Sequence, residues 1–340
     1  GPDALIMADP GLILLVRERW PDIPVHLSVQ ANTMNHASVR FWQAQGISRI
    51  ILSRELSLEQ IGEIRQQCPD MELEVFVHGA LCIAYSGRCL LSGYFNHRDA
   101  NQGTCTNSCR WDYKLKNASE DISGDIHVGT TRPERDVYLL EEKERPGEHM
   151  PIEEDEHGTY IMNSKDLRAV EHVERLVKMG ITSLKIEGRT KSHYYVARTT
   201  QVYRRAIDDA LAGRPFDASQ LGTLENLSNR GYTDGFLQRH PDQDYQNYLE
   251  ASSSSNRQRF VGELTGYDPA SGLAEVDVKN KFAPGDDMEL ILPDGNRSFR
   301  LTELYDMNGQ RMDEVPGGGH RVRIPLQDGR FEMGLLARKL

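Results

Sequence analysis

The sequence predicts an α/β fold, namely part of a TIM-type (β/α) barrel followed by a small antiparallel β-barrel domain. In the first part of the chain, strand-like apolar runs alternate with amphipathic helical segments. In the last part, alternating apolar residues are separated by Asp-Pro, Ser-Gly, Pro-Gly and Asp-Gly turns. A serine-rich linker, residues 251–256, divides the two. We therefore expect one domain over residues 1–250 and a second over residues 257–340.

Five apolar runs have the character of buried parallel strands. Helical segments separate them, and these end at proline or glycine, as helices commonly do. A closed barrel has eight such strands. Because the first run begins within a few residues of the amino terminus, we expect the last five βα units of a barrel, with the first three lost by truncation. The five runs are residues 4–8, 25–29, 49–52, 73–77 and 183–186.

Helical segments are recognised by their apolar spacing and their caps. Ser57 and Gln60 form a capping-box pattern at the start of the third helical segment. Residues 166–179 show helical spacing closed by a glycine, and a long helix is expected over residues 194–211. Residues 80–160, between the fourth and fifth strands, read as an irregular insertion.

Polar residues follow every predicted strand. Each one alone is more simply explained as a helix cap or a loop residue. Their recurrence at successive carboxyl ends is what the active-site face of a barrel requires. The residues are Asp9, then Gln30 and Asn32, then Ser53, Arg54 and Glu55, then His78, and finally Glu187 and Arg189.

Four of the five cysteines lie within 28 consecutive positions directly after the fourth strand: Cys82, Cys89, Cys105 and Cys109. Their spacing, C-x6-C-x15-C-x3-C, leaves an iron–sulfur cluster, a zinc site and redox-active thiols open. Clustered thiols in a cysteine-poor chain fit a reducing compartment. The sequence also shows no secretory signal and no membrane-spanning run, so we expect a cytoplasmic protein.

The net charge of −11 is concentrated in one segment. Residues 134–157 hold ten acidic and three basic side chains, or −7 of that total. A basic face elsewhere therefore stays open as a contact for nucleic acid. Its candidate residues are Arg189, Lys191, Arg198, Arg204 and Arg205.

Several motifs resemble those of the collagenase-like peptidase family U32, and in particular its branch linked to tRNA hydroxylation. They are EVFVHGALCIAYSGRCLLS at 74–92, HLSVQANTMN at 26–35, NSKDL at 163–167 and SLKIEGRTKS at 183–192. This resemblance implies formation of 5-hydroxyuridine at the tRNA wobble position, with prephenate as co-substrate. It also implies a [4Fe-4S] cluster bound by Cys82, Cys89, Cys105 and Cys109.

Within that resemblance, the strand-end residues take candidate catalytic roles. Arg54, Arg189 and Lys191 are candidates to bind prephenate carboxylates or tRNA phosphates. His78 and Glu187 are candidate proton carriers, and Glu55 belongs to the same candidate set. Lys185 is equally explained as an inward charge paired with Glu55 or Glu187.

Two other functions stay open on the sequence. The first is the peptidase activity of the family name, although the chain contains neither G-x-S-x-G nor H-E-x-x-H. The second is a non-catalytic RNA-binding or assembly module in which the cysteines only brace a loop.

Overall fold

The computed structural model of the chain describes residues 1–81, 85–89, 97–98, 104–106, 165–189, 191–227, 229, 231–238, 258–326 and 331–340, and the backbone of five short strands between 118 and 160. The chain divides into two compact units. Unit 1 comprises Gly1–Thr190, Tyr203–Asp217 and Asn229–Ser253, and unit 2 comprises Lys191–Val202, Ala218–Ser228 and Ser254–Leu340. The expected linker at 251–256 lies outside the described residues.

Unit 1 contains five parallel strands that are neighbours in chain order. Each coincides with an apolar run predicted from the sequence, so the strand prediction is confirmed. The last of them is half-buried along its length rather than fully buried. The strands are β1 (Leu5–Met7), β2 (Val25–Leu27), β3 (Arg49–Ile51), β4 (Glu72–Ala80) and β11 (Ser183–Ile186).

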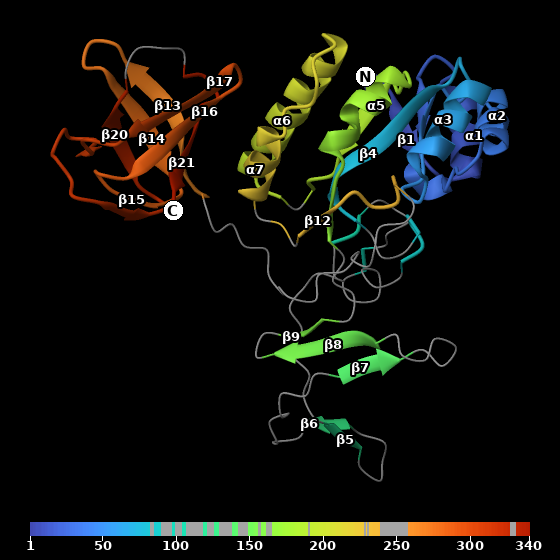
Figure 1. Ribbon diagram of the computed structural model, residues 1–340, viewed down its shortest axis with the longest axis horizontal. Helices are drawn as coiled ribbons and strands as arrows, with labels where there is room; N and C mark the ends of the chain where they lie inside the picture. Colours follow the sequence, from blue (N-terminus) through green and yellow to red (C-terminus); the bar gives the residue numbers. More distant parts are fainter. Residues whose placement is uncertain are drawn as a thin grey trace. The chain divides into compact units, whose positions relative to one another are not determined.

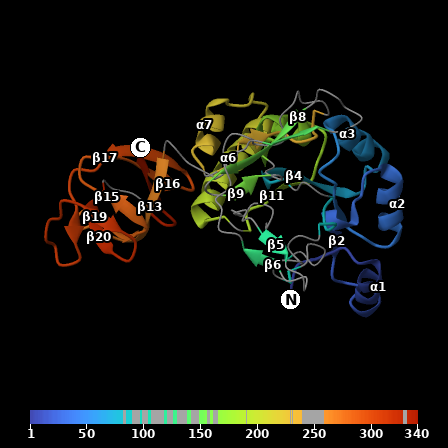
Figure 2. The same cartoon turned by 90° about the horizontal axis from the view of Figure 1, so that it is seen from below.

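The connecting helices lie on the same side of strands β1 to β4 in both views of the chain (Figures 1 and 2). They are α1 (Pro10–Arg19), α2 (His36–Ala44) and α3 (Leu58–Gln67). Right-handed crossovers that always step to the next strand in one direction put every helix on one face. The predicted capping box at the start of α3 is confirmed, with reciprocal bonds between Ser57 and Gln60.

The two faces of this sheet differ in polarity. Leu27, Ile50 and Leu73 are paired in register and fully buried, as expected of the face that the helices cover. His26, Arg49 and Glu72, also in register with one another, occupy the opposite face. Charges there are neutralised locally, as in the 2.8 Å ion pair between Arg49 and Glu72.

Residues 166–168, predicted as the start of a helix, instead form the strand β10 (Asp166–Arg168), which pairs antiparallel with the end of β4. Only the rest of the segment is helical, in a 3-10 turn (Val170–His172) and in α5 (Val173–Lys178). The prediction was wrong at 166–168 because pairing with β4 outweighs the local pattern.

The insertion predicted as irregular contains short antiparallel strands, so that prediction was also wrong. Runs of three to seven residues in a charge-rich sequence give too little apolar alternation to be recognised. β5 pairs with β6, and β8 pairs with both β7 and β9. The strands are β5 (Ala118–Glu120), β6 (Ile126–Val128), β7 (Tyr138–Glu141), β8 (His149–Asp155) and β9 (Gly158–Tyr160).

Seven of the described strands of unit 1 form one open sheet. Their order is β1-β2-β3-β4-β10-β12, with β11 also paired to β4 and β12 formed by Tyr232–Thr233. The mixed α/β character is therefore confirmed, whereas a closed TIM barrel is not seen among these strands. The parallel strands follow chain order without the reversal that defines a doubly wound sheet.

The predicted long helix is confirmed as α6 (His193–Leu211), and it is followed by α7 (Ser219–Glu225). The boundary between the two units falls within α6, at residues 202 and 203. None of the helices in the described part of the chain is long and apolar enough to cross a membrane.

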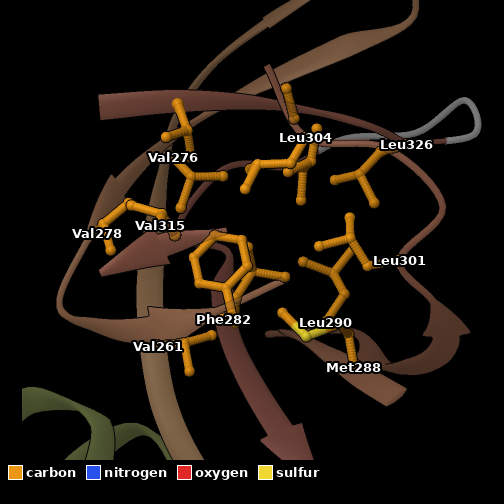
Figure 3. Packing of buried hydrophobic residues seen from close by; sticks show 14 of the residues in the cluster. Val261, Val276, Val278, Phe282, Met288, Leu290, Leu301, Leu304, Val315 and Leu326 are labelled. Atoms are coloured by element: carbon orange, nitrogen blue, oxygen red, sulfur yellow. The ribbon is translucent and has the colours of Figure 1, made fainter. Parts of the chain in front are cut away.

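Unit 2 contains the predicted antiparallel β domain. Its core gathers around Phe282, which is fully buried together with Val261 and Val276 (Figure 3). A seven-stranded sheet has the order β17-β16-β21-β13-β14-β20-β18, and β15 pairs with β19. The strands are β13 (Gln258–Asp268), β14 (Leu273–Val278), β15 (Asn280–Phe282), β16 (Asp287–Leu292), β17 (Gly295–Arg300), β18 (Tyr305–Asp306), β19 (Val315–Gly317), β20 (Arg321–Pro325) and β21 (Leu335–Lys339).

A buried ion pair fastens the first half of α6 to this domain. Arg198, 2% exposed, lies 3.0 Å from the carboxylate of Glu289 in β16. Gln258 bonds to both side chains, and Tyr194 donates to Gln258. Burial raises the pKa of the Tyr194 hydroxyl to about 12, so it remains a neutral donor at physiological pH.

Removing one partner of this pair should destabilise the protein strongly. We expect Glu289→Leu to lower the free energy of unfolding by about 3–5 kcal/mol, because it leaves a buried guanidinium without its carboxylate. Asp208→Ala, which breaks the exposed pair with Arg204, should cost less than about 1 kcal/mol. Urea unfolding measures both, and equal losses would contradict the importance of the buried pair.

Candidate active site

The ends of β3, β4 and β11 meet at the backbone of Ala80. Arg54 Nη1, just after β3, donates to the Ala80 carbonyl oxygen at 3.2 Å. The Ala80 N–H donates to Glu187 Oε2, just after β11, at 3.3 Å. Glu187 Oε1 accepts from the N–H of Arg189 at 3.1 Å. The structure thus brings three predicted site residues, Arg54, Glu187 and Arg189, into one hydrogen-bonded chain.

Two described parts of the cysteine-bearing segment are anchored to these strand ends. Arg189 Nη1 donates to the carbonyl oxygen of Cys105 at 3.1 Å. Asn32, beyond β2, donates from Nδ2 to the carbonyl oxygen of Ser86 at 3.3 Å, three residues before Cys89. The segment is therefore held at the carboxyl end of β2 and at that of β11.

Gly79 is what allows the ends of β4 and β11 to approach. Its φ is +112°, and a β-carbon there would lie 2.2 Å from the carbonyl oxygen of Glu187. No side chain fits at that distance. The sequence carried a signal for this, since glycine inside a strand pattern often marks a close backbone approach.

The guanidinium of Arg54 also packs against an aromatic ring. Its guanidinium lies 4.1 Å from the ring centroid of Phe76, and Lys185 Nζ lies 5.6 Å from the same ring. Lys185 forms its ion pair with Glu74 at 2.9 Å. The prediction that Lys185 pairs with Glu55 or Glu187 was wrong, because Glu74 lies on β4, the strand paired directly with β11.

Glu55 and Ser53 interact with each other just after β3, where the Ser53 hydroxyl donates to the carboxylate. Ser53 also receives backbone support, since its N–H donates to the carbonyl oxygen of Thr33 beyond β2. Asp9, by contrast, is the N-cap of α1 and accepts from the N–H of Leu12 at 2.8 Å. For Asp9 the simpler explanation, a helix cap, accounts for the residue.

His78 is 1% exposed and lies between the rings of Tyr203 in α6 and Tyr232 in β12. The Tyr203 hydroxyl donates to the Val77 carbonyl oxygen at 2.6 Å and accepts from the Ala169 N–H at 3.1 Å. Burial raises the pKa of Tyr203, which keeps that proton in place.

The tautomer of His78 follows from these contacts. The Tyr203 hydroxyl has one proton, and it is donated to the Val77 carbonyl oxygen. His78 Nδ1 lies 3.3 Å from the same hydroxyl oxygen, so Nδ1 must be the donor. Nε2 is then the nitrogen that carries the lone pair in the neutral ring. The structure thus places His78 in a packed tyrosine environment, whereas Arg54, Glu187 and Arg189 share the chain through Ala80.

The basic face considered from the sequence is largely committed to ion pairs. Arg198 is buried against Glu289, Arg204 pairs with Asp208, and Arg205 pairs with Asp217. Lys191 lies over the ring of Tyr195, with its Nζ 5.0 Å from the centroid. Arg189 stays exposed beside Cys105.

The described cysteines provide two thiols suited to bind a metal. Cys89 and Cys105 are half-buried and neither is in a disulfide. Cys82 and Cys109 lie outside the described residues, although Cys82 is only two positions beyond Ala80. In the part of the chain that is described, no three Cys, His, Asp or Glu side chains converge on a metal position. Cys68 is 4% exposed and packs its sulfur against the His36 carbonyl oxygen.

Comparison with known proteins identifies the family. The family model described as peptidase family U32 matches residues 1–247, and that of the peptidase family U32 C-terminal domain matches residues 256–338. The chain belongs to peptidase family U32, which confirms the resemblance seen in its motifs.

Two curated relatives carry a more specific name, tRNA hydroxylation protein P. The chain is 60% identical to the one from Escherichia coli, over 99% of this chain and 78% of that protein. It is 56% identical to the one from Haemophilus influenzae, over 100% of this chain and 78% of that protein. An uncharacterized protease of Methanocaldococcus jannaschii is 35% identical, over 95% of this chain and 74% of that protein.

Replacing Gly79 should disrupt the site more than a similar change at an open glycine. Gly79→Ala introduces both an unfavourable φ and a clash with the Glu187 carbonyl, so we expect a loss of more than about 3 kcal/mol in unfolding free energy. Gly272→Ala is the control, because Gly272 also has positive φ (+69°) but nothing within 4 Å of a β-carbon. That variant should lose about 1–2 kcal/mol. Equal losses, measured by urea unfolding, would contradict the close approach of β4 and β11.

Proposed function

We propose that this protein is a tRNA-modifying hydroxylase. The observation that carries the proposal is the 60% identity, over 99% of the chain, to a protein named tRNA hydroxylation protein P. The candidate site supplies compatible groups. Arg54 and Arg189 are cationic at any physiological pH, and their guanidinium groups lie at the same strand ends.

The proposed reaction forms 5-hydroxyuridine at the tRNA wobble position, with prephenate as co-substrate. A base in the anticodon loop can be presented unstacked, and this is how sequence-specific RNA recognition generally reaches a base edge. The two arginines would bind the carboxylates of prephenate or the phosphates of the loop. Glu187, fixed through two backbone N–H groups, would carry a proton at the end of β11.

Cys82, Cys89, Cys105 and Cys109 would hold a [4Fe-4S] cluster in the same proposal. The half-buried thiols of Cys89 and Cys105 fit the donor chemistry that such clusters use. The cluster would supply electron transfer. Arg189 would position the Cys105 segment through its bond to that residue's carbonyl oxygen.

We also propose that the parallel strands belong to a TIM-type (β/α) barrel. Their chain-order arrangement and the helices gathered on one face support this interpretation. The charged face that carries Arg49, Glu74 and Lys185 would then line the barrel interior, with the candidate site at its carboxyl-end rim.

Metal and sulfide analysis tests the cluster. We expect the anaerobically isolated protein to contain iron and sulfide and to be brown, and Cys89→Ser and Cys105→Ser each to lose most of both. Cys68→Ser is the matched control and should retain them, because Cys68 is 4% exposed and its sulfur lies against the His36 carbonyl oxygen. Bound zinc without iron or sulfide would refute the cluster.

Nucleoside analysis tests the reaction. Expression of the protein in an Escherichia coli strain that lacks its own tRNA hydroxylation protein P should restore 5-hydroxyuridine in digested tRNA. Arg54→Met should reduce that restoration at least about 10-fold if the guanidinium binds an anionic reactant through charge-assisted hydrogen bonds. Tight tRNA binding without any 5-hydroxyuridine would instead favour the non-catalytic RNA-binding module.

A peptidase is the second candidate, because one relative is named a protease. The His78 ring lies 3.3 Å from the Tyr203 hydroxyl, and Cys68 Sγ lies 3.6 Å from the His36 carbonyl oxygen. Neither of these two contacts is the Cys–His pair that activates a thiol nucleophile. Hydrolysis of collagen-like peptides that is lost in Cys82→Ala would favour the peptidase.

A further inference from the structure

An aromatic side chain stands exposed on an anchored turn beside the candidate site. Tyr85 is 58% exposed, whereas Ser86, its neighbour, is 7% exposed. The turn is closed by the Arg88 N–H, which donates to the Tyr85 carbonyl oxygen at 3.0 Å. Arg88 is itself exposed on the same turn.

The backbone of this turn is fixed to the end of β2. Asn32 donates to the Ser86 carbonyl oxygen at 3.3 Å. A β-carbon on Gly87 would lie 3.1 Å from the side chain of Gln30, so the turn packs closely there. The φ of Gly87, +76°, is a conformation that glycine adopts without strain. The backbone of the turn that carries Tyr85 is thus fixed in place by these contacts.

The turn is also connected to the strand end that carries Arg54. The N–H of Ser53 donates to the carbonyl oxygen of Thr33, the residue after Asn32, at 3.2 Å. Ser53 directly precedes Arg54. Tyr85 therefore lies on a turn that is anchored to the same rim as the guanidinium proposed to bind an anionic reactant.

We propose that Tyr85 is a stacking platform for the wobble nucleobase of the RNA substrate, with Arg88 on the same turn to contact a phosphate. This inference rests on the proposed function and identifies how the RNA loop is engaged. A tyrosine ring offers a flat apolar face that any base can stack on, and exposed aromatic side chains serve this role in proteins that bind single-stranded nucleic acid. A single exposed aromatic is ordinary on a protein surface. What distinguishes Tyr85 is its anchored turn at the site rim.

Binding of two anticodon stem-loop RNAs to the protein tests the platform. One RNA carries uridine at the wobble position, and the other is abasic there. We expect Tyr85→Ala to weaken binding of the uridine RNA about 5- to 150-fold and to leave the abasic RNA unchanged, since stacking contributes about 1–3 kcal/mol per base. Tyr85→Phe should bind both RNAs as the unaltered protein does.

The matched control is Phe41→Ala, which removes an aromatic side chain of equal exposure, 57%, from α2. It should change neither affinity. Equal weakening of both RNAs by Tyr85→Ala, or failure of Tyr85→Phe to bind normally, would overturn the stacking role. If Tyr85→Ala binds and hydroxylates normally, the platform fails while the proposed function stands. If the unaltered protein binds neither RNA, both fail.

Discussion

The close approach of β4 and β11 at Gly79 is the contact on which the candidate site depends. Only a residue without a β-carbon lets the Glu187 carbonyl oxygen come so near. Because the two backbones meet there, the Ala80 N–H reaches the Glu187 carboxylate. The Ala80 carbonyl oxygen also accepts from Arg54, which follows β3. One small residue thus brings charges from two strand ends into a single hydrogen-bonded chain.

The charged face of the sheet is stable because its charges are paired across neighbouring strands. Glu74, buried in the middle strand, accepts from Ser183 and Lys185 on β11. Phe76, two positions on, has the cations of Arg54 and Lys185 near its ring. Such contacts hold an arginine in one orientation before any ligand binds, and preorganised charge is what an active site needs.

Much of this arrangement could be predicted. The five strands, the capping box at Ser57 and the alternating strands of the β domain are local patterns, and all were confirmed. The errors have a common cause. Residues 166–168 form a strand because they lie beside β4, and Lys185 pairs with Glu74 because Glu74 also lies on β4. Both outcomes depend on which segment of the chain is the neighbour. Periodicity within one segment does not contain that information.

By itself, the sequence determined the parallel strands, the polar residues at their carboxyl ends and the grouping of the cysteines beyond β4. These follow from side-chain period and from the direction of parallel strands. Only the tertiary structure decided which polar residues meet. It joined Arg54, Glu187 and Arg189 through the backbone of Ala80, and it packed His78 between two tyrosines from distant segments. The physical reason is that hydrogen bonds and ring contacts act over a few ångströms, between residues more than 100 positions apart in the chain.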